Sequence, residues 1–243
     1  MTCYDGARPR LAVRVNPDFE LKGSGMRMGG GAKPFGVDAE RAASLAKRII
    51  AVGAEWRGWH IFAGSQALDA QAIIAAQGET IALAARLSEQ VGASPPLVNL
   101  GGGFGVPYFP GDEPLDVAAI GAALGEALAG RPAVLQSSEF AIELGRYLVA
   151  EAGVYLTRVI DVKLSQGERF AIVDGGLHHQ LAASGNFGTV VRRNYPIALA
   201  NRFGEGMADE PVTVVGCLCT PLDRLGDAVA LPSMAPGDLV ALF

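Results

Sequence analysis

Hydrophobic and polar positions follow a repeating order of strand, loop and helix over the first 150 residues. Runs rich in β-branched or aromatic residues at 11–17, 56–62, 97–100 and 133–139 predict four short buried strands. Apolar residues at helical spacing predict one helix after Asp38 and two more at about 69–91 and 116–129. Strands that alternate with helices pair in parallel, and their ligands gather at the carboxyl ends of the strands.

After residue 150 the pattern changes to short β-rich runs separated by Gly, Pro and Asp turns. These runs lie at 154–164, 169–176, 211–219, 227–232 and 238–243. With no long amphipathic helix between them, they predict a mostly antiparallel β-domain, a sandwich or barrel. We therefore expect an α/β cofactor-binding domain at 1–150 and a β-domain at 151–243.

The four strand–helix units are too few for a complete α/β barrel. An eight-stranded barrel of this type needs roughly 250 residues, and the first domain has about 150. The fold class expected is therefore α/β, with about half of a TIM-type barrel followed by the β-domain. The last predicted strand runs to the final residue, so we expect a chain that is truncated at both ends.

Composition narrows the class of protein. The chain has 243 residues, of which 50% are hydrophobic and 19% charged, and its net charge is −5. It has no basic run that would bind nucleic acid and no apolar run long enough to cross a membrane. The three cysteines, Cys3, Cys217 and Cys219, suggest neither a disulfide framework nor a zinc site. With no stretch typical of a signal peptide, we expect a cytoplasmic protein without metal.

A glycine-rich segment follows the third predicted strand directly. The run LVNLGGGFG places Gly101, Gly102 and Gly103 where backbone N–H groups can approach an anion without obstruction by side chains. A tight glycine turn without a ligand is the alternative interpretation. The segment is therefore a candidate phosphate site.

Two further groups carry candidate chemistry. In ELGR, Glu143 can meet a protonated ring nitrogen while Arg146 neutralises a phosphate, although an exposed ion pair at this spacing is common. In HIFAGSQ, His60 can pack on a flat cofactor and Ser65 can donate to a phosphate, whereas a lone histidine on a strand is more often structural. The cysteines of GCLCTPLD can equally be two small residues of a strand.

Together these motifs resemble a known family. The order GGGAKPFG, HIFAGSQ, GGGFG, ELGR, VDGG, GCLCTPLD resembles the fold type III pyridoxal-phosphate-dependent decarboxylases, which act on ornithine, arginine, lysine and diaminopimelate. The resemblance covers nearly all of 10–243. The longer HIFAGSQ segment and RVNPDFELKGSGMRMGGG are similar to an exosortase-associated subgroup that is linked to carrier-bound amino acids.

The resemblance implies roles for particular residues. Pyridoxal 5'-phosphate would be held by His60, Ser65, Gly101, Gly102, Gly103, Glu143, Gly145 and Arg146. His60 resembles the histidine stacked on the cofactor ring, and Glu143 the glutamate that pairs with the ring nitrogen. Cys219 resembles the cysteine that a partner subunit contributes as a proton donor, which implies a homodimer with shared active sites. Asp174, Arg193 and Asp223 are candidates for substrate binding.

The chain departs from the family pattern at two important places. The Schiff-base lysine of the family lies on an early barrel strand, and Lys22, Lys33, Lys47 and Lys163 all stand in other contexts. The segment with the family's active-site tyrosine, after the last strand, is also absent. We therefore expect an amino-acid decarboxylase fragment that is inactive alone. A non-catalytic, regulator-like partner of a decarboxylase subunit and an amino-acid racemase of the same fold are the alternatives.

Overall fold

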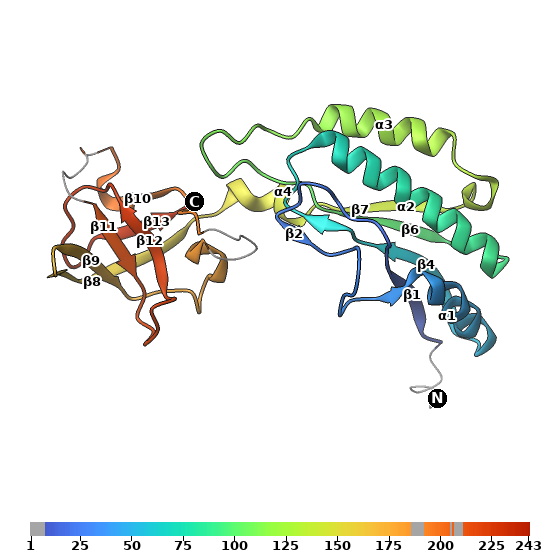
Figure 1. The fold of residues 1–243 in the computed structure, drawn as a ribbon, viewed down its shortest axis with the longest axis horizontal. Coiled ribbons are helices and arrows are strands. Elements are labelled where there is room, and N and C mark those ends of the chain that lie inside the picture. Colours follow the sequence, from blue (N-terminus) through green and yellow to red (C-terminus); the bar gives the residue numbers. More distant parts are fainter. Residues whose placement is uncertain (1–7, 186–191, 205, 207–210) are drawn as a thin grey trace. The chain divides into compact units, whose positions relative to one another are not determined.

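The computed structural model describes residues 8–185, 192–204, 206 and 211–243, and it divides the chain into two compact units (Figure 1). The first unit contains Met1–Pro107 and Asp112–Leu148, and the second contains Tyr108–Gly111 and Val149–Phe243. A segment of four residues thus belongs with the second unit although the sequence on both its sides belongs with the first.

The first unit is built on a parallel sheet of five strands in the order β3-β1-β4-β6-β7. The strands are β1 (Arg10–Asn16), β3 (Val37–Asp38), β4 (Glu55–Ile61), β6 (Leu97–Gly102) and β7 (Glu139–Glu143). A separate antiparallel pair, β2 (Met26–Arg27) and β5 (Gly64–Ser65), lies in the loops that follow β1 and β4. All five strands of the sheet therefore end on the same side of the unit.

Three long helices connect the strands: α1 (Ala39–Ala51), α2 (Ala70–Val91) and α3 (Val117–Ala129). The Asp69 carboxylate caps α2 by accepting hydrogen bonds from the Gln71 and Ala72 backbone N–H groups, and Gly92 ends the helix with φ +80°. Asp116 caps α3 in the same way. Short helical segments follow: η1 (Ala133–Leu135), α4 (Gly145–Val149) and η2 (Ala150–Ala152).

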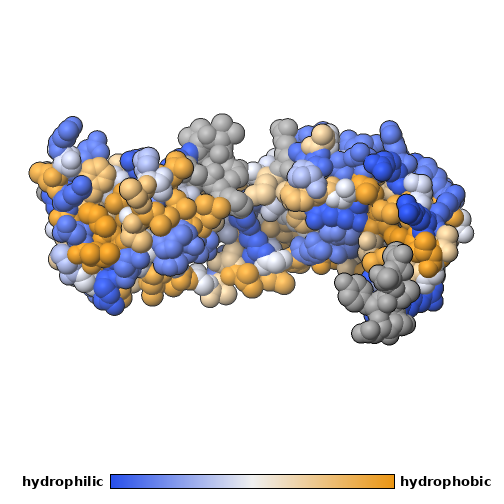
Figure 2. All heavy atoms as spheres, turned by 90° about the horizontal axis from the view of Figure 1, so that it is seen from below, coloured by the Kyte–Doolittle hydropathy of each residue, from blue (hydrophilic) through white to orange (hydrophobic). Residues whose placement is uncertain are grey.

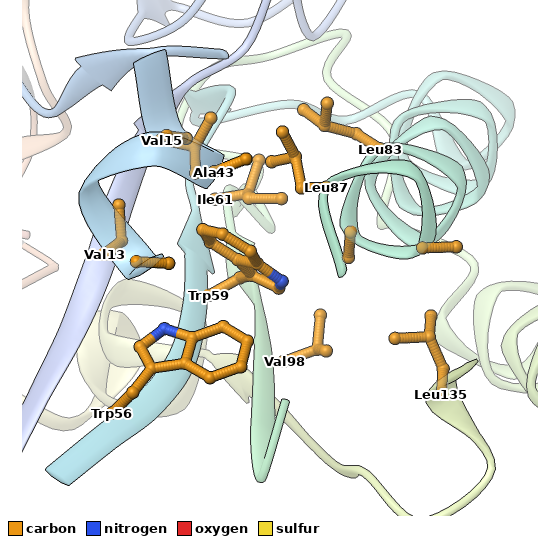
Figure 3. Packing of buried hydrophobic residues seen from close by; sticks show 14 of the residues in the cluster. Val13, Val15, Ala43, Trp56, Trp59, Ile61, Leu83, Leu87, Val98 and Leu135 are labelled. Carbon is orange, nitrogen blue, oxygen red and sulfur yellow. The ribbon is translucent and has the colours of Figure 1, made fainter. Parts of the chain in front are cut away.

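The core of the first unit lies between one face of the sheet and the helices (Figure 3). Trp59 of β4 is 1% exposed, and its indole N–H donates a 2.9 Å hydrogen bond to the Ser88 hydroxyl of α2. Trp56 packs edge-on against Trp59 with ring centroids 5.1 Å apart. Because side chains alternate along a strand, the polar residues Arg14, His60 and Asn99 lie on the opposite face.

The second unit contains a curled, mixed sheet of six strands in the order β10-β13-β8-β9-β11-β12. They are β8 (Tyr155–Ser165), β9 (Glu168–Val173), β10 (Ile197–Leu199), β11 (Val212–Val215), β12 (Arg224–Val229) and β13 (Leu239–Leu242), with η3 (Leu181–Ser184) and η4 (Ala200–Arg202) between them. β9 and β11 pair in parallel, and the other neighbours are antiparallel. The sheet encloses its own core around Val159, Val173 and Val214.

Apolar side chains also lie on the surface. Leu156, Ile160 and Leu164 of β8 are all at least half exposed, at 50%, 53% and 69%. Figure 2 shows hydrophobic residues among hydrophilic ones on the displayed face. Within the described residues, no helix is both long and apolar enough to span a membrane.

The structure corrects three details of the sequence analysis. The segment predicted as the fourth strand, 133–139, begins with η1, and the strand itself is β7. Asp38 precedes α1 without capping it, because its carboxylate accepts a hydrogen bond from the Asn16 side chain instead. Cys217 and Cys219 lie in a bend beyond β11 rather than in a strand.

Candidate active site

Three polar side chains from neighbouring strands meet on the open face of the parallel sheet. His60 of β4 is in register with Asn99 of β6, and the Asn99 side-chain amide donates a 2.9 Å hydrogen bond to Oε1 of Glu143 in β7. Nε2 of His60 lies 3.4 Å from the same oxygen, at ion-pair distance but without a hydrogen bond to it or to any other described residue. The Glu143 side chain is 48% exposed, so its carboxylate remains accessible to a ligand.

The three glycines at the end of β6 bring the ends of three strands close together. Gly102 pairs with Glu143, and a Cβ atom on Gly102 would collide with the Glu143 carbonyl oxygen. A Cβ on Gly101, which has φ +73°, would lie 2.6 Å from the Ile61 carbonyl oxygen. The Gly101 N–H also donates a 2.9 Å hydrogen bond to Oδ1 of Asn99. These glycines are therefore required by close packing, whether or not they also bind an anion.

Ser65 lies in a loop that packs against the end of the glycine segment. A Cβ on Gly103 would lie 2.5 Å from the carbonyl oxygen of Gly64, the neighbour of Ser65. The Ala67 N–H donates to the Gly103 carbonyl oxygen at 2.9 Å, and Gly105 N–H donates to the Ala67 carbonyl oxygen at 2.8 Å. The structure thus brings the Ser65 loop and the glycine segment to one place.

Gly145 and Arg146 begin the short helix α4, directly after β7. The next residue, Tyr147, packs edge-on against Phe104 of the glycine segment, with ring centroids 6.0 Å apart. Arg146 therefore lies in a helix that contacts the same segment. All predicted cofactor-binding residues belong to the first unit and follow or end the strands β4, β6 and β7.

Two residues of this face were not identified from the sequence. Asn99 joins the glycine segment to Glu143, and Arg14 of β1 is in register with His60. The Arg14 guanidinium lies 5.2 Å from the Phe35 ring centroid and 5.9 Å from that of Phe62. Asn99 precedes the first glycine by two residues, so alternation along the strand was the signal that could have placed it on this face.

The predicted substrate-binding and proton-donor residues all lie in the second unit. Asp174 follows β9, and its Oδ1 accepts hydrogen bonds of 2.8 Å from the Arg158 N–H and the Thr157 hydroxyl. These hydrogen bonds hold the pKa of the Asp174 carboxyl below its usual range, and the bond from the Arg158 backbone is the largest cause. Asp174 is therefore an exposed carboxylate with a fixed orientation.

Tyr155 and His179 lie beside the turn that follows Asp174. The Gly176 N–H donates to the Tyr155 hydroxyl at 3.0 Å, and this hydroxyl lies 3.3 Å from Nδ1 of His179. Burial is the main reason that the pKa of Tyr155 is raised. The neighbouring His178 ring lies 3.9 Å from that of His179, centroid to centroid.

Cys219 and Asp223 share the bend between β11 and β12. Cys217 and Cys219 are both free and exposed, whereas Asp223 is 2% exposed. The two Asp223 carboxylate oxygens accept hydrogen bonds from the backbone N–H groups of Leu177 and Leu218. The bend touches the turn after β9, because the Cys217 thiol lies 3.7 Å from the Asp174 carbonyl oxygen.

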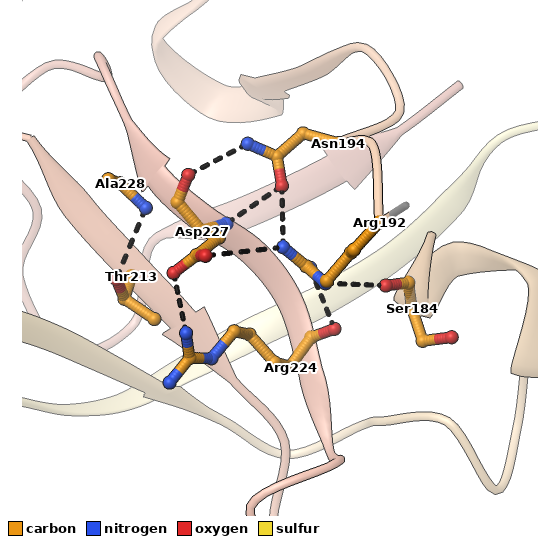
Figure 4. Close-up of polar contacts among 7 residues, drawn as sticks. All are labelled: Ser184, Arg192, Asn194, Thr213, Arg224, Asp227 and Ala228. Atoms are coloured by element: carbon orange, nitrogen blue, oxygen red, sulfur yellow. Dashed lines mark hydrogen bonds and ion pairs between the residues drawn. The ribbon is translucent and has the colours of Figure 1, made fainter. Parts of the chain in front are cut away.

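Arg193 packs against an aromatic ring of the second unit. Its guanidinium lies 3.8 Å above the Phe109 ring, which packs against Tyr195 with centroids 5.5 Å apart. The preceding residue, Arg192, is held inward by hydrogen bonds to the Ser184 and Arg224 carbonyl oxygens and to the Asn194 side chain (Figure 4). Desolvation lowers the pKa of Arg192. Arg192 thus has a structural position, whereas the adjacent Arg193 is exposed.

Comparison with known proteins identifies the family. A family model for the pyridoxal-dependent decarboxylase, C-terminal sheet domain, matches residues 2–243. An L-glutamyl-(BtrI acyl-carrier protein) decarboxylase from Niallia circulans is 38% identical over 238 residues, which are 96% of this chain and 55% of that protein. A diaminopimelate decarboxylase from Thermoplasma acidophilum is 30% identical over 221 residues, which are 90% of this chain and 50% of that protein.

Solved structures show the same fold. The crystal structure of a Helicobacter pylori diaminopimelate decarboxylase (I148L mutant) complexed with L-lysine matches with a TM-score of 0.78 and 27% identity, over 98% of this chain and 56% of that one. The chain therefore spans about half the length of the relatives it matches. With the family model matching almost every residue, this chain belongs to the pyridoxal-dependent decarboxylases.

Proposed function

We propose that this chain forms the part of an amino-acid decarboxylase that holds the ring and phosphate of pyridoxal phosphate, together with the β-domain that meets the substrate. One observation carries the proposal. The Glu143 carboxylate, at the end of β7, is fixed by Asn99, lies beside the His60 ring and stays exposed next to the glycine-rich end of β6. This is the combination that a planar, phosphorylated cofactor with a protonated ring nitrogen requires.

The residues present fit the cofactor. Nε2 of His60 is buried without a hydrogen bond to the described residues, and the glycine segment offers a surface free of side chains. When bound, pyridoxal phosphate supplies a ring that withdraws the electrons released as carbon dioxide leaves. Glu143 would hold a proton at the ring nitrogen and His60 would pack on the ring. The phosphate would be held by Ser65, Gly101, Gly102, Gly103, Gly145 and Arg146.

In the second unit, we assign the proton transfer to Cys219, whose exposed thiol can donate to the α-carbon of a bound amino acid. Asp174 and Arg193 offer one negative and one positive group for the substrate. Asp223, the third candidate for substrate binding, has both carboxylate oxygens engaged by backbone N–H groups. As in the family resemblance, Cys219 would act across a homodimer.

The proposal also covers the fold of the two domains. We propose that 1–150 forms about half of a TIM-type barrel, because its five parallel strands are covered by helices on one face and carry the site residues on the other. Residues 151–243 form the β-domain, and the complete enzyme works in the cytoplasm. With Lys22, Lys33, Lys47 and Lys163 away from the family's lysine position, the chain alone would be inactive.

Two substrate classes follow from the relatives. The Niallia circulans protein acts on an L-glutamyl carrier protein, and several others are diaminopimelate decarboxylases. The higher identity to the former, 38% against 30%, favours a carrier-linked amino acid. Diaminopimelate or ornithine is the second class.

Cofactor binding by the chain tests the proposal. We expect saturable binding of pyridoxal phosphate in equilibrium dialysis, without covalent trapping by borohydride. Glu143→Gln should weaken this binding at least threefold, whereas Glu139→Gln, at the other end of β7, should leave it unchanged. A chain that binds no pyridoxal phosphate, or two variants that behave alike, would contradict the assignment. Covalent trapping would show that one of the four lysines serves after all.

A further inference from the structure

The bend between β11 and β12 is closed around the carboxylate of Asp223. Oδ1 accepts a 2.8 Å hydrogen bond from the Leu177 N–H, and Oδ2 accepts one of 2.9 Å from the Leu218 N–H. The backbone of Asp223 closes the same bend, because Gly216 N–H donates to its carbonyl oxygen at 2.8 Å and its own N–H donates to Thr220 at 3.2 Å. One residue therefore fixes the bend from both the main chain and the side chain.

Two glycines enclose this carboxylate. A Cβ atom on either Gly176 or Gly216 would collide with the Asp223 carboxylate oxygens. Gly176 belongs to the turn after β9, and Gly216 begins the bend itself. The carboxylate therefore fills the space between the two segments, which agrees with an exposure of only 2%. Such an enclosed group is poorly placed to reach a substrate.

The position of the hydrogen bond along the bend matters for the cysteines. Leu218 stands between Cys217 and Cys219, so anchoring its N–H fixes the backbone that carries both thiols. The Cys217 thiol makes a second contact with the turn, at 3.7 Å from the Asp174 carbonyl oxygen. Hydrogen bonds from N–H groups to a carboxylate are stronger than those to neutral acceptors, so Asp223 is the dominant anchor.

We propose that Asp223 is a positioning residue, which holds the Cys219 thiol in place, rather than a residue that reads the substrate. This inference rests on the proposed function, in which Cys219 delivers a proton to the substrate. The hydrogen bonds of Asp223 on which it rests do not depend on the cofactor. The bend, with its exposed thiols, is held against the turn that carries Asp174 by a single buried anion.

The native chain provides the first test. Hydrogen exchange followed by NMR should show that the Leu177 and Leu218 amides exchange at least tenfold more slowly than unstructured amides, although neither lies in a helix or strand. Rapid exchange at both amides would overturn the proposal without any variant. This measurement therefore holds even if substitution of Asp223 prevents folding.

Asp223→Asn provides the second test, because the amide keeps one acceptor oxygen and replaces the other with a donor. We expect exchange at Leu177 or Leu218 to accelerate at least tenfold and alkylation of Cys219 by iodoacetamide, followed residue by residue in a mass spectrometer, to change at least threefold. The control is Asp238→Asn, which removes a carboxylate that accepts from the Ala235 N–H in a different loop.

The control separates positioning from a general loss of stability. Asp238→Asn should lower the melting temperature and leave the Cys219 rate as in the native chain. Equal Cys219 rates in the native chain and the folded Asp223→Asn variant would overturn the positioning role. A chain that fails to bind pyridoxal phosphate but passes these tests would contradict the proposed function alone.

Discussion

The side-chain amide of Asn99 links the backbone of the glycine segment to the carboxylate of Glu143, through hydrogen bonds of 2.9 Å on each side. The amide can do this because it has both an acceptor and a donor. Its oxygen accepts from the Gly101 N–H, and its nitrogen donates to Oε1 of Glu143. A residue with only one of these functions would leave one half of the link unmade.

Asn99→Asp should therefore keep the glycine segment and disturb Glu143. The new carboxylate still accepts from Gly101 but faces the Glu143 carboxylate, and like charges at this distance repel each other. We expect a loss of about 1 kcal/mol in the free energy of unfolding at pH 7, which shrinks as the pH falls and either carboxylate is protonated. Urea unfolding at pH 7 and pH 4 measures this difference, and a loss that is equal at both pH values would contradict the link.

Gly102 and Gly121 should respond in opposite directions to the same substitution. Gly102→Ala forces a Cβ against the Glu143 carbonyl oxygen and should disrupt the pairing of β6 with β7, at a cost of about 2 kcal/mol or more. Gly121 lies in α3, and a Cβ there would meet nothing within 4 Å. Gly121→Ala should stabilise the chain by about 0.5–1 kcal/mol. Thermal unfolding of both variants tests this contrast.

Asp174 should contribute a pH-dependent part of the stability. Its folded-state pKa is lowered from the ordinary 3.8 by the hydrogen bonds from Arg158 and Thr157. The contribution is therefore present above the unfolded pKa and is lost as the pH falls through the folded value. Because the side chain is exposed, we expect about 1 kcal/mol or less. In urea unfolding, Asp174→Asn should lower the free energy of unfolding at pH 6, and this loss should shrink as the pH falls through the folded-state pKa.

The adjacent arginines of the second unit should differ in their effect on stability. Arg192→Ala removes three hydrogen bonds from a half-buried guanidinium, and we expect a loss of about 2–3 kcal/mol. Arg193→Ala removes a cation–π contact with Phe109, which at an exposed site contributes about 0.5–1 kcal/mol. Urea unfolding of both variants measures the difference. A larger loss for Arg193→Ala would reverse the assignment of structural and exposed roles.

The elements with a strong local pattern could be predicted from the sequence. The strands that end at Asn16, Ile61 and Gly102 and the helix that Gly92 terminates all lie where periodicity and turn residues indicate them. The fourth strand was placed too early because the apolar run AVL reads equally as a strand or a buried turn. Leu135 is fully buried in η1. In the sequence, such a buried apolar residue looks the same in a turn as in a strand.

The site could be predicted residue by residue but not as an arrangement. The glycines, His60 and Glu143 carry recognisable motifs, whereas Asn99 has a role only through strand register. Asp223 was predicted as a substrate-binding residue from its charge, and the positioning role that we propose for it depends on surroundings that the sequence does not show. Its burial depends on Gly176 and Leu177. Leu177 lies 46 residues before Asp223 in the sequence.

Tyr108–Gly111 also limits how the protein can be divided for experiments. Since this segment clusters with Val149–Phe243, the polypeptide passes from one unit to the other three times rather than once. A cut near residue 150 would leave Tyr108 and Phe109 on one fragment and their aromatic partner Tyr195 on the other. Two separately expressed halves would each expose part of this cluster to water, and co-expression would be needed to restore it.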